Sequence, residues 1–142
     1  MHLLQVVVVA HDPASMRSIS IVLDRSLDRG LLDIRYFVDS ADALDWIQAS
    51  NCELVITALE MPGIDGLRLV RAAKQGNAHT QVIVVSPQTT SEQLDELAEL
   101  GACDILLQPL DKLLLRELVE QAIARIRRWQ SALNQVRKPV LV

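Results

Sequence analysis

Only a few side chains in this sequence could do chemistry, and each follows an apolar run. His11 and Asp12 follow residues 4–10, Glu60 follows residues 54–58, Ser86 follows residues 82–85, and Gln108 follows residues 103–107. A histidine beside carboxylates could bind a metal ion or respond to pH. No second histidine accompanies His11, however, and Asp12-Pro13 has the order of a helix N-cap and a first helical residue. We therefore expect an exposed loop histidine, a capping aspartate and no metal site.

The elements that position these side chains form a regular alternation. Apolar runs at residues 4–10, 32–38, 54–58, 82–85 and 103–107 are each followed by a segment with helical periodicity. Continuous Val- and Ile-rich runs are typical of strands buried on both faces, as in a parallel sheet. The order predicts an α/β fold with helices on both faces of that sheet. Because such folds bind ligands at the carboxyl ends of the strands, any chemistry is expected there.

Capping and turn residues place the helix ends. The first helix is expected from Pro13 to Gly30, with Met16, Ile19, Val22, Leu23 and Leu27 on its apolar face. Ser40 is a candidate cap for the second helix, and the third ends near Gly76. A Thr90–Gln93 capping box and Gly101 bound the fourth, and the last helix begins near Asp111.

Composition narrows the class of protein. A chain of 142 residues suits one domain, and its net charge of −4 argues against general nucleic-acid binding. Residues 121–142 hold five basic residues and no acid, which suits the C-terminal end of a helix. Cys52 and Cys103 lack paired spacing and are expected to be buried thiols in a reducing compartment. With no signal-peptide pattern and no apolar run near a bilayer's width, we expect a cytoplasmic protein without a membrane segment.

Three separate loops carry a resemblance to a known family. The turn Met61-Pro62-Gly63-Ile64-Asp65-Gly66 resembles an M-P-x-M-D-G motif, and Gly101-Ala102 followed by an apolar strand and Pro109 resembles G-A-x-x-x-x-x-K-P. With the first strand and Asp12-Pro13, these motifs resemble the CheY-like receiver domains of two-component response regulators over about residues 4–126. The resemblance implies a flavodoxin-like three-layer (βα)5 sandwich with strand order 2-1-3-4-5. We expect a receiver-like domain at residues 1–128 and an extension of the last helix with its tail at residues 129–142.

The resemblance also implies a phosphorylation site that this chain has lost. Receivers accept a phosphoryl group on an aspartate after the third strand, with Mg²⁺ held by acids after the first strand and a lysine before the final proline. Metal and lysine neutralise charge as the phosphoryl group moves. The resemblance places Ala58 at the acceptor, Ala10 and His11 at the acids, and Gln108, before Pro109, at the lysine. Of the usual groups only the Ser86 hydroxyl remains, and it is expected to bond its own loop. Glu60 is expected to point toward solvent.

These losses favour a pseudo-receiver that is not an enzyme and uses no cofactor. It would act in phosphorelay-type signalling through protein partners, by the face of the fourth helix, fifth strand and fifth helix at about residues 90–130. One alternative is a small-molecule receptor whose ligand replaces phosphate in a less polar pocket. An enzyme or flavoprotein of the same fold is disfavoured, because no Gly-, Ser- or Thr-rich phosphate loop follows the first strand.

The last helix carries an apolar seam longer than a receiver needs. Its members recur at spacings of four and three over three heptads: Leu115, Val119, Ala122, Ile126, Trp129, Leu133 and Val136. This is the a/d pattern of helices that pack along one another. The first half can pack on the chain's own sheet, whereas Trp129, Leu133 and Val136 would leave an apolar stripe in water. We expect a homodimer through this helix; the alternative is a tail that folds back or frays. The end, Lys138-Pro139-Val140-Leu141-Val142, resembles the start of a further segment as much as a finish.

Overall fold

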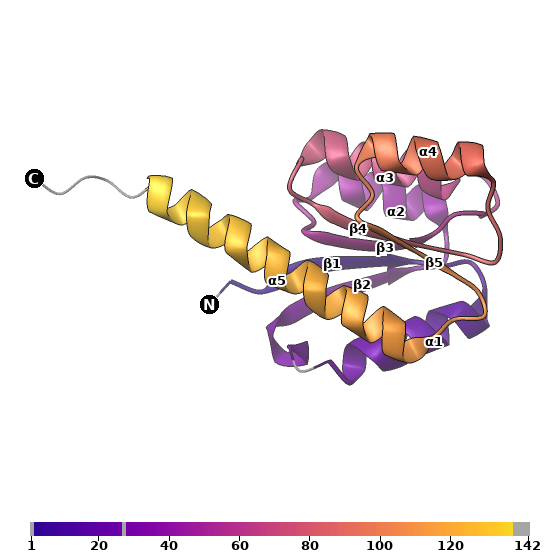
Figure 1. The fold of residues 1–142 in the computed structure, drawn as a ribbon, viewed down its shortest axis with the longest axis horizontal. Coiled ribbons are helices and arrows are strands. Elements are labelled where there is room, and N and C mark those ends of the chain that lie inside the picture. Colours follow the sequence, from indigo (N-terminus) through magenta and orange to yellow (C-terminus); the bar gives the residue numbers. More distant parts are fainter. Residues whose placement is uncertain (1, 27, 138–142) are drawn as a thin grey trace, which may run out of the picture.

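The computed structural model describes residues 2–26 and 28–137, which form an alternating α/β domain (Figure 1). The strands are β1 (Leu4–Val9), β2 (Leu32–Phe37), β3 (Leu54–Ala58), β4 (Gln81–Ser86) and β5 (Asp104–Leu107). The helices are α1 (Pro13–Asp24), α2 (Ser40–Ala49), α3 (Gly66–Gly76), α4 (Ser91–Leu100) and α5 (Lys112–Arg137), with a short 3-10 turn at Arg29–Leu31. The strand boundaries lie within one residue of those expected from the sequence.

All five strands are parallel in one sheet with the order β2-β1-β3-β4-β5, which confirms the predicted flavodoxin-like fold. The helices lie in two layers, with α1 and α5 on one face and α2, α3 and α4 on the other (Figure 1). Because every connection crosses from one parallel strand to the next through a helix, the five βα loops gather at the carboxyl ends of the strands. We call this the carboxyl edge, and the opposite side the amino edge.

The apolar runs build a core on each side of the sheet. In β1, Val6 and Val8 pack in the cluster under α1 and α5, whereas Val7 and Val9 pack in the cluster under α2, α3 and α4. Successive side chains of a strand point to opposite faces, so an uninterrupted valine run supplies both clusters. The sheet is therefore covered on both faces, as the run predicted.

Two helix ends differ from the sequence expectation. The first helix was expected to continue to Gly30, but α1 ends at Asp24, with Arg25 as its C-cap. The Ser26 hydroxyl accepts a hydrogen bond from the Asp28 amide at 3.3 Å, an alternative to helical bonding that serine favours. Leu27 lies outside the described residues. The cap of α2 is Asp39, whose carboxylate accepts from the Ala41 amide at 2.8 Å, and not Ser40.

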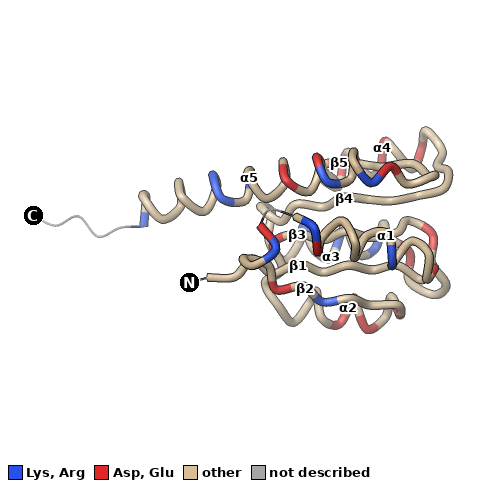
Figure 2. Tube along the Cα trace, turned by 90° about the horizontal axis from the view of Figure 1, so that it is seen from below, with Lys and Arg blue, Asp and Glu red and all other residues tan. Residues whose placement is uncertain are grey.

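The expected caps of the other helices are present. Thr90 and Gln93 form the capping box of α4, and Gly101 ends that helix in the left-handed region, with a φ of 88°. The longest helix, α5, continues for 26 residues, so its last turns project beyond the sheet (Figures 1 and 2). Over the described residues, no helix has the length and apolar character needed to cross a membrane.

Candidate functional site

The carboxyl edge brings together the residues that the sequence singled out. Ala58 ends β3 beside Val85 of β4, and Ser86 ends β4 beside Leu107 of β5. Backbone hydrogen bonds hold the strand ends together where the loops begin. The Leu59 amide donates to the Val85 carbonyl at 3.0 Å, and the Gln108 amide donates to the Ser86 carbonyl at 2.8 Å. At this edge Ala10 is buried in the core cluster beneath α1 and α5, and Ala58 is half-buried.

Gln108 is held in a short hydrogen-bonded chain. Its side-chain amide Nε2 donates to the Ser15 hydroxyl at 2.9 Å, and that hydroxyl donates to the Asp12 carboxylate at 3.0 Å. Asp12 also accepts from the backbone amides of Ala14 and Ser15, which confirms its predicted capping role. The Ser15 hydroxyl and the Ala14 amide lower the pKa of the Asp12 carboxyl below its ordinary value. These hydrogen bonds thus connect the loop after β5 to the beginning of α1.

The Ser86 hydroxyl is also committed locally. It donates to the carbonyl of Gln88 in its own loop, as expected from the sequence, and the serine is fully buried. The Thr57 hydroxyl donates in the same way to the adjacent Ala58 carbonyl at 2.9 Å. Both hydroxyls are therefore used to fix the loops rather than directed at an open site.

The turn after β3 is fixed by close backbone approaches. Ser40, buried at the start of α2, donates to the Pro62 carbonyl at 3.2 Å and accepts from the Ile64 amide at 3.2 Å. Gly63 has a φ of 81°, and a Cβ on Gly66 would lie 2.3 Å from the Ala58 carbonyl oxygen. Both glycines are therefore required by geometry. Asp65 caps α3, as expected of turn chemistry.

Two polar residues that the sequence singled out, His11 and Glu60, take no part in the side-chain hydrogen bonds described above for the carboxyl edge. His11 and Glu60 are both exposed, in agreement with their predicted loop and solvent positions. Among the described residues, no three side chains of His, Cys, Asp or Glu gather in a way that could hold a metal ion.

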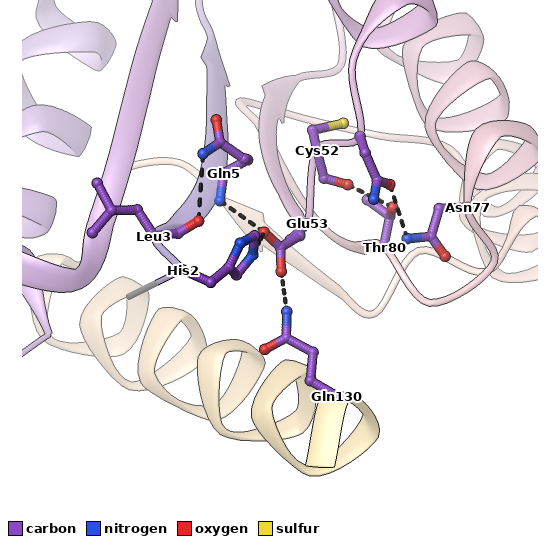
Figure 3. Close-up of polar contacts among 9 residues, drawn as sticks. His2, Leu3, Gln5, Cys52, Glu53, Asn77, Thr80 and Gln130 are labelled. Atoms are coloured by element: carbon purple, nitrogen blue, oxygen red, sulfur yellow. Dashed lines mark hydrogen bonds and ion pairs between the residues drawn. The ribbon is translucent and has the colours of Figure 1, made fainter. Parts of the chain in front are cut away.

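A second polar centre, at the amino edge, was missed by the sequence analysis. Glu53, which precedes β3, has only 7% of its surface exposed. Its carboxylate accepts from the Gln5 amide at 3.1 Å and from the Gln130 side chain on α5, and it lies 2.9 Å from the His2 ring (Figure 3). Since these partners lie 48 to 77 residues away from Glu53 in the chain, no local pattern could have grouped them.

A groove of about 600 Å³ opens beside this centre, and we call it the base groove. Helix α5 contributes Ile126, Trp129 and Leu133 to its lining, and the domain contributes residues that include Ile47, Asn51 and His79. The Trp129 and His79 rings are in contact, with their centroids 4.6 Å apart and their planes tilted by 35°. The structure therefore has a built recess at the edge opposite the expected site.

The apolar seam of α5 divides as the sequence predicted. Leu115, Val119, Ala122 and Ile126 are buried in the core beneath α5. Trp129 is 50% exposed and Val136 is 84% exposed, with Leu133 half-buried between them. The tail at residues 138–142, like the notion of a further segment there, lies outside the described residues.

Comparison with known proteins agrees with this fold. Residues 6–120 match the response regulator receiver domain family. The chain is 32% identical over 128 residues to the DNA-binding transcriptional regulator NtrC of Rhizobium meliloti, a match covering 90% of this chain and 26% of that protein. It is 26% identical to the chemotaxis protein CheY of Pseudomonas aeruginosa, covering 84% of this chain and 97% of CheY. A CheY-like receiver domain protein from Methanospirillum hungatei superposes with a TM-score of 0.74 at 17% identity, over 89% of this chain and 98% of that one.

The chain therefore belongs to the response regulator receiver domain family of two-component signalling. It spans about a quarter of the length of the NtrC relatives that it matches, and nearly the whole length of CheY.

Proposed function

We propose that this chain is a pseudo-receiver, which passes on a signal by protein contact without accepting a phosphoryl group and without catalysing a reaction of its own. The observation that carries the proposal is the methyl group of Ala58 at the end of β3, where the family resemblance calls for a nucleophilic carboxylate. Gln108 supports it, because a neutral amide stands in place of the cation and is bound to Ser15 instead. A cytoplasmic location, where such signalling partners are found, belongs to the same proposal.

The direct test is phosphorylation with a small donor. The chain should gain no mass when incubated with acetyl phosphate and Mg²⁺, as measured by intact mass spectrometry. Ala58→Asp restores the acceptor alone and should also stay unmodified, since Ala10 and His11 supply no carboxylate for the metal. Ala10→Asp with His11→Asp, added to Ala58→Asp, tests whether the missing acids are the reason. A stoichiometric, acid-labile gain of one phosphoryl group on the unmodified chain would refute the proposal.

The contact surface is proposed to be the face formed by α4, β5 and the start of α5. Each of these elements carries an exposed leucine: Leu94 on α4, Leu107 on β5 and Leu114 at the start of α5, of which Leu107 is 50% exposed. A contiguous patch of exposed apolar side chains marks an interaction site, whereas single exposed apolar residues are common on any protein surface. Leu107→Ser should abolish capture of a partner, whereas Val38→Ser, the same kind of change at an exposed residue after β2, should not. Equal capture by both variants would remove this face from the proposal.

A small-molecule ligand in the degenerate pocket is the second candidate. Alanines at positions 10 and 58, where the family resemblance calls for carboxylates, make this pocket less polar, which favours a ligand other than phosphate. The hydrogen bonds that already join Gln108, Ser15 and Asp12 count against it, because a ligand would have to displace them. A thermal-shift screen separates the candidates, since only binding to the folded state raises the melting temperature.

We also propose that the chain forms a homodimer through the projecting part of α5, residues 129–137, which we call the overhang. Its apolar stripe is left partly in water, and a symmetric pair is the commonest way for a soluble chain to cover such a stripe. Leu133→Asp should shift sedimentation from dimer to monomer at tens of micromolar protein. Gln135→Asp adds the same charge at an exposed position off the stripe and is the matched control. If both variants and the unmodified chain are monomeric, the stripe does not drive self-association.

A further inference from the structure

The base groove limits how a second copy can approach the overhang. Trp129 and Leu133 line it, and Trp129 also contacts His79 of the chain's own domain. Their side chains therefore face the amino edge of that domain rather than open water on all sides. In Figures 1 and 2 the described part of the overhang runs away from the domain. The lining of the groove follows α5 from Ile126, in the core, to Arg137 at the end of the described helix.

A parallel pair of helices fits this arrangement poorly. In a parallel pair both domains would lie at the same end of the helix pair, so the partner's domain would crowd the side of Trp129 where the chain's own His79 already lies. In an antiparallel pair the two domains lie at opposite ends, and only the end of the partner helix approaches the exposed half of Trp129.

We propose that the base groove receives the overhang of a second copy of this chain, with the two overhangs packed antiparallel. This inference rests on the proposed dimer and specifies its geometry. The two-fold axis passes between Ala132 and Leu133, so that Trp129 meets the partner's Val136 and the small Ala132 meets the partner's Leu133. A large side chain set against a small one allows helices to interdigitate closely. The interface is isologous, because Trp129 and Leu133 line the groove of their own chain and also enter the groove of the partner.

The charges of the overhang agree with a copy of itself as the occupant. Residues 129–136 carry no ionisable side chain, and Figure 2 shows this uncharged stretch between the cations at 127–128 and at 137. Two such segments can overlap over their whole length without bringing charges into the interface. Arg128 and the partner's Arg137 come near each other only at the two ends, where water and salt screen them. Dimerisation should therefore strengthen as salt rises.

Disulfide trapping tests the geometry on the full-length chain. Gln48 lines the base groove, is exposed, and has no hydrogen bond among those the structure shows; Val136 lies at the far end of the stripe. Gln48→Cys and Val136→Cys are made separately, and each is oxidised alone and as an equimolar mixture. The unmodified chain, which carries Cys52 and Cys103, is the control for native thiols. The antiparallel arrangement predicts a covalent dimer in the mixture at least tenfold above that in either single sample.

The outcomes separate this inference from the dimer proposal on which it rests. Val136→Cys that forms a covalent dimer with itself, and none in excess in the mixture, indicates a parallel pair and overturns the antiparallel arrangement. No trapping in any sample, while sedimentation still shows a dimer, places the interface elsewhere and also overturns it. A chain that is monomeric by sedimentation contradicts the proposed dimer itself.

Discussion

Gly66 provides a sharp test of how the turn after β3 is built. A Cβ at this position would lie 2.3 Å from the Ala58 carbonyl oxygen and 2.9 Å from the Leu59 Cα. Real Cβ contacts essentially never fall below 3.0 Å, so the alanine variant must move backbone by at least 0.7 Å. The Gly66 amide donates to the Leu59 carbonyl at 2.8 Å, so the same movement would also strain that hydrogen bond. Neither neighbour can swing away, because both are main-chain atoms.

Gly76 ends the same helix and is the matched control. Nothing lies within 4 Å of a Cβ built there, and its φ is negative. Gly76→Ala should therefore stabilise the chain by about 0.5–1 kcal/mol, since alanine loses less backbone entropy on folding. Gly66→Ala should destabilise it by about 1–3 kcal/mol, the usual cost of overpacking. Both variants replace a glycine of α3 by alanine, but the expected changes in the free energy of unfolding have opposite signs.

Urea denaturation followed by circular dichroism measures both free energies of unfolding, with unchanged m-values as the check that the transition stays two-state. In a domain of this size, each kcal/mol corresponds to about 2–4 °C in melting temperature, so the variants should also melt several degrees apart. If Gly66→Ala is as stable as the unmodified chain, the close approach of α3 to the end of β3 is not a constraint. The geometric reason for the glycine in this turn would then be wrong.

Three further predictions follow from single groups. Because the pKa of Asp12 is lowered in the folded chain, its ionised carboxylate stabilises the fold at neutral pH. The difference in urea midpoint between the unmodified chain and Asp12→Asn should therefore shrink as pH falls below about 4. A difference that stays constant down to pH 2 would contradict this. Burial raises the pKa of Cys52 to about 11, two units above the ordinary 9.0, so at pH 8 a thiol reagent should find roughly a hundredfold less thiolate there than at an ordinary exposed cysteine. Labelling of Cys52 on mixing, without denaturant, would show that it is not buried. Gln130→Ala leaves a Glu53 oxygen without its donor and should cost about 1–3 kcal/mol, whereas Asn134→Ala, exposed on the same helix, should cost under about 0.5 kcal/mol.

The fold could be predicted from the sequence because its signals are local. A strand buried on both faces needs a short unbroken apolar run, and the valines of β1 show it without any knowledge of their partners. Gly101 and the Thr90–Gln93 pair act within one helical turn, so their effect on α4 can also be read directly. The end of α1 could not, because helical spacing continued through Leu27 while the Ser26 hydroxyl bonded the Asp28 amide instead. Spacing and side-chain bonding conflicted there, and spacing alone gave the wrong boundary.

The candidate site was predicted in its position but not in its bonding. Loop order alone placed Ala58, Ser86 and Gln108 at one edge of the sheet. That Gln108 bonds Ser15 depends on two residues 93 positions apart, and the sequence contains no sign of their pairing. The contacts of Glu53 were missed for the same reason. In the sequence it is an ordinary acid before a strand, and only the fold brings His2, Gln5 and Gln130 to its carboxylate.

The two edges of the sheet differ in a way that bears on how this receiver could work. At the carboxyl edge, Gln108, Ser15 and Asp12 satisfy one another, so a bound group would have to replace existing hydrogen bonds. At the amino edge, Glu53 is satisfied too, but beside it lies a groove whose wall is the half-exposed Trp129 of α5. A ligand or partner shifts a conformational equilibrium only through contacts that differ between its states. The base groove has a volume of about 600 Å³ in which contacts could be added, and α5 connects it to the exposed Leu114 near the start of the helix. Under the proposed mechanism, in which no phosphoryl group is used and the chain dimerises, the last helix is thus the element best placed to couple self-association to partner binding.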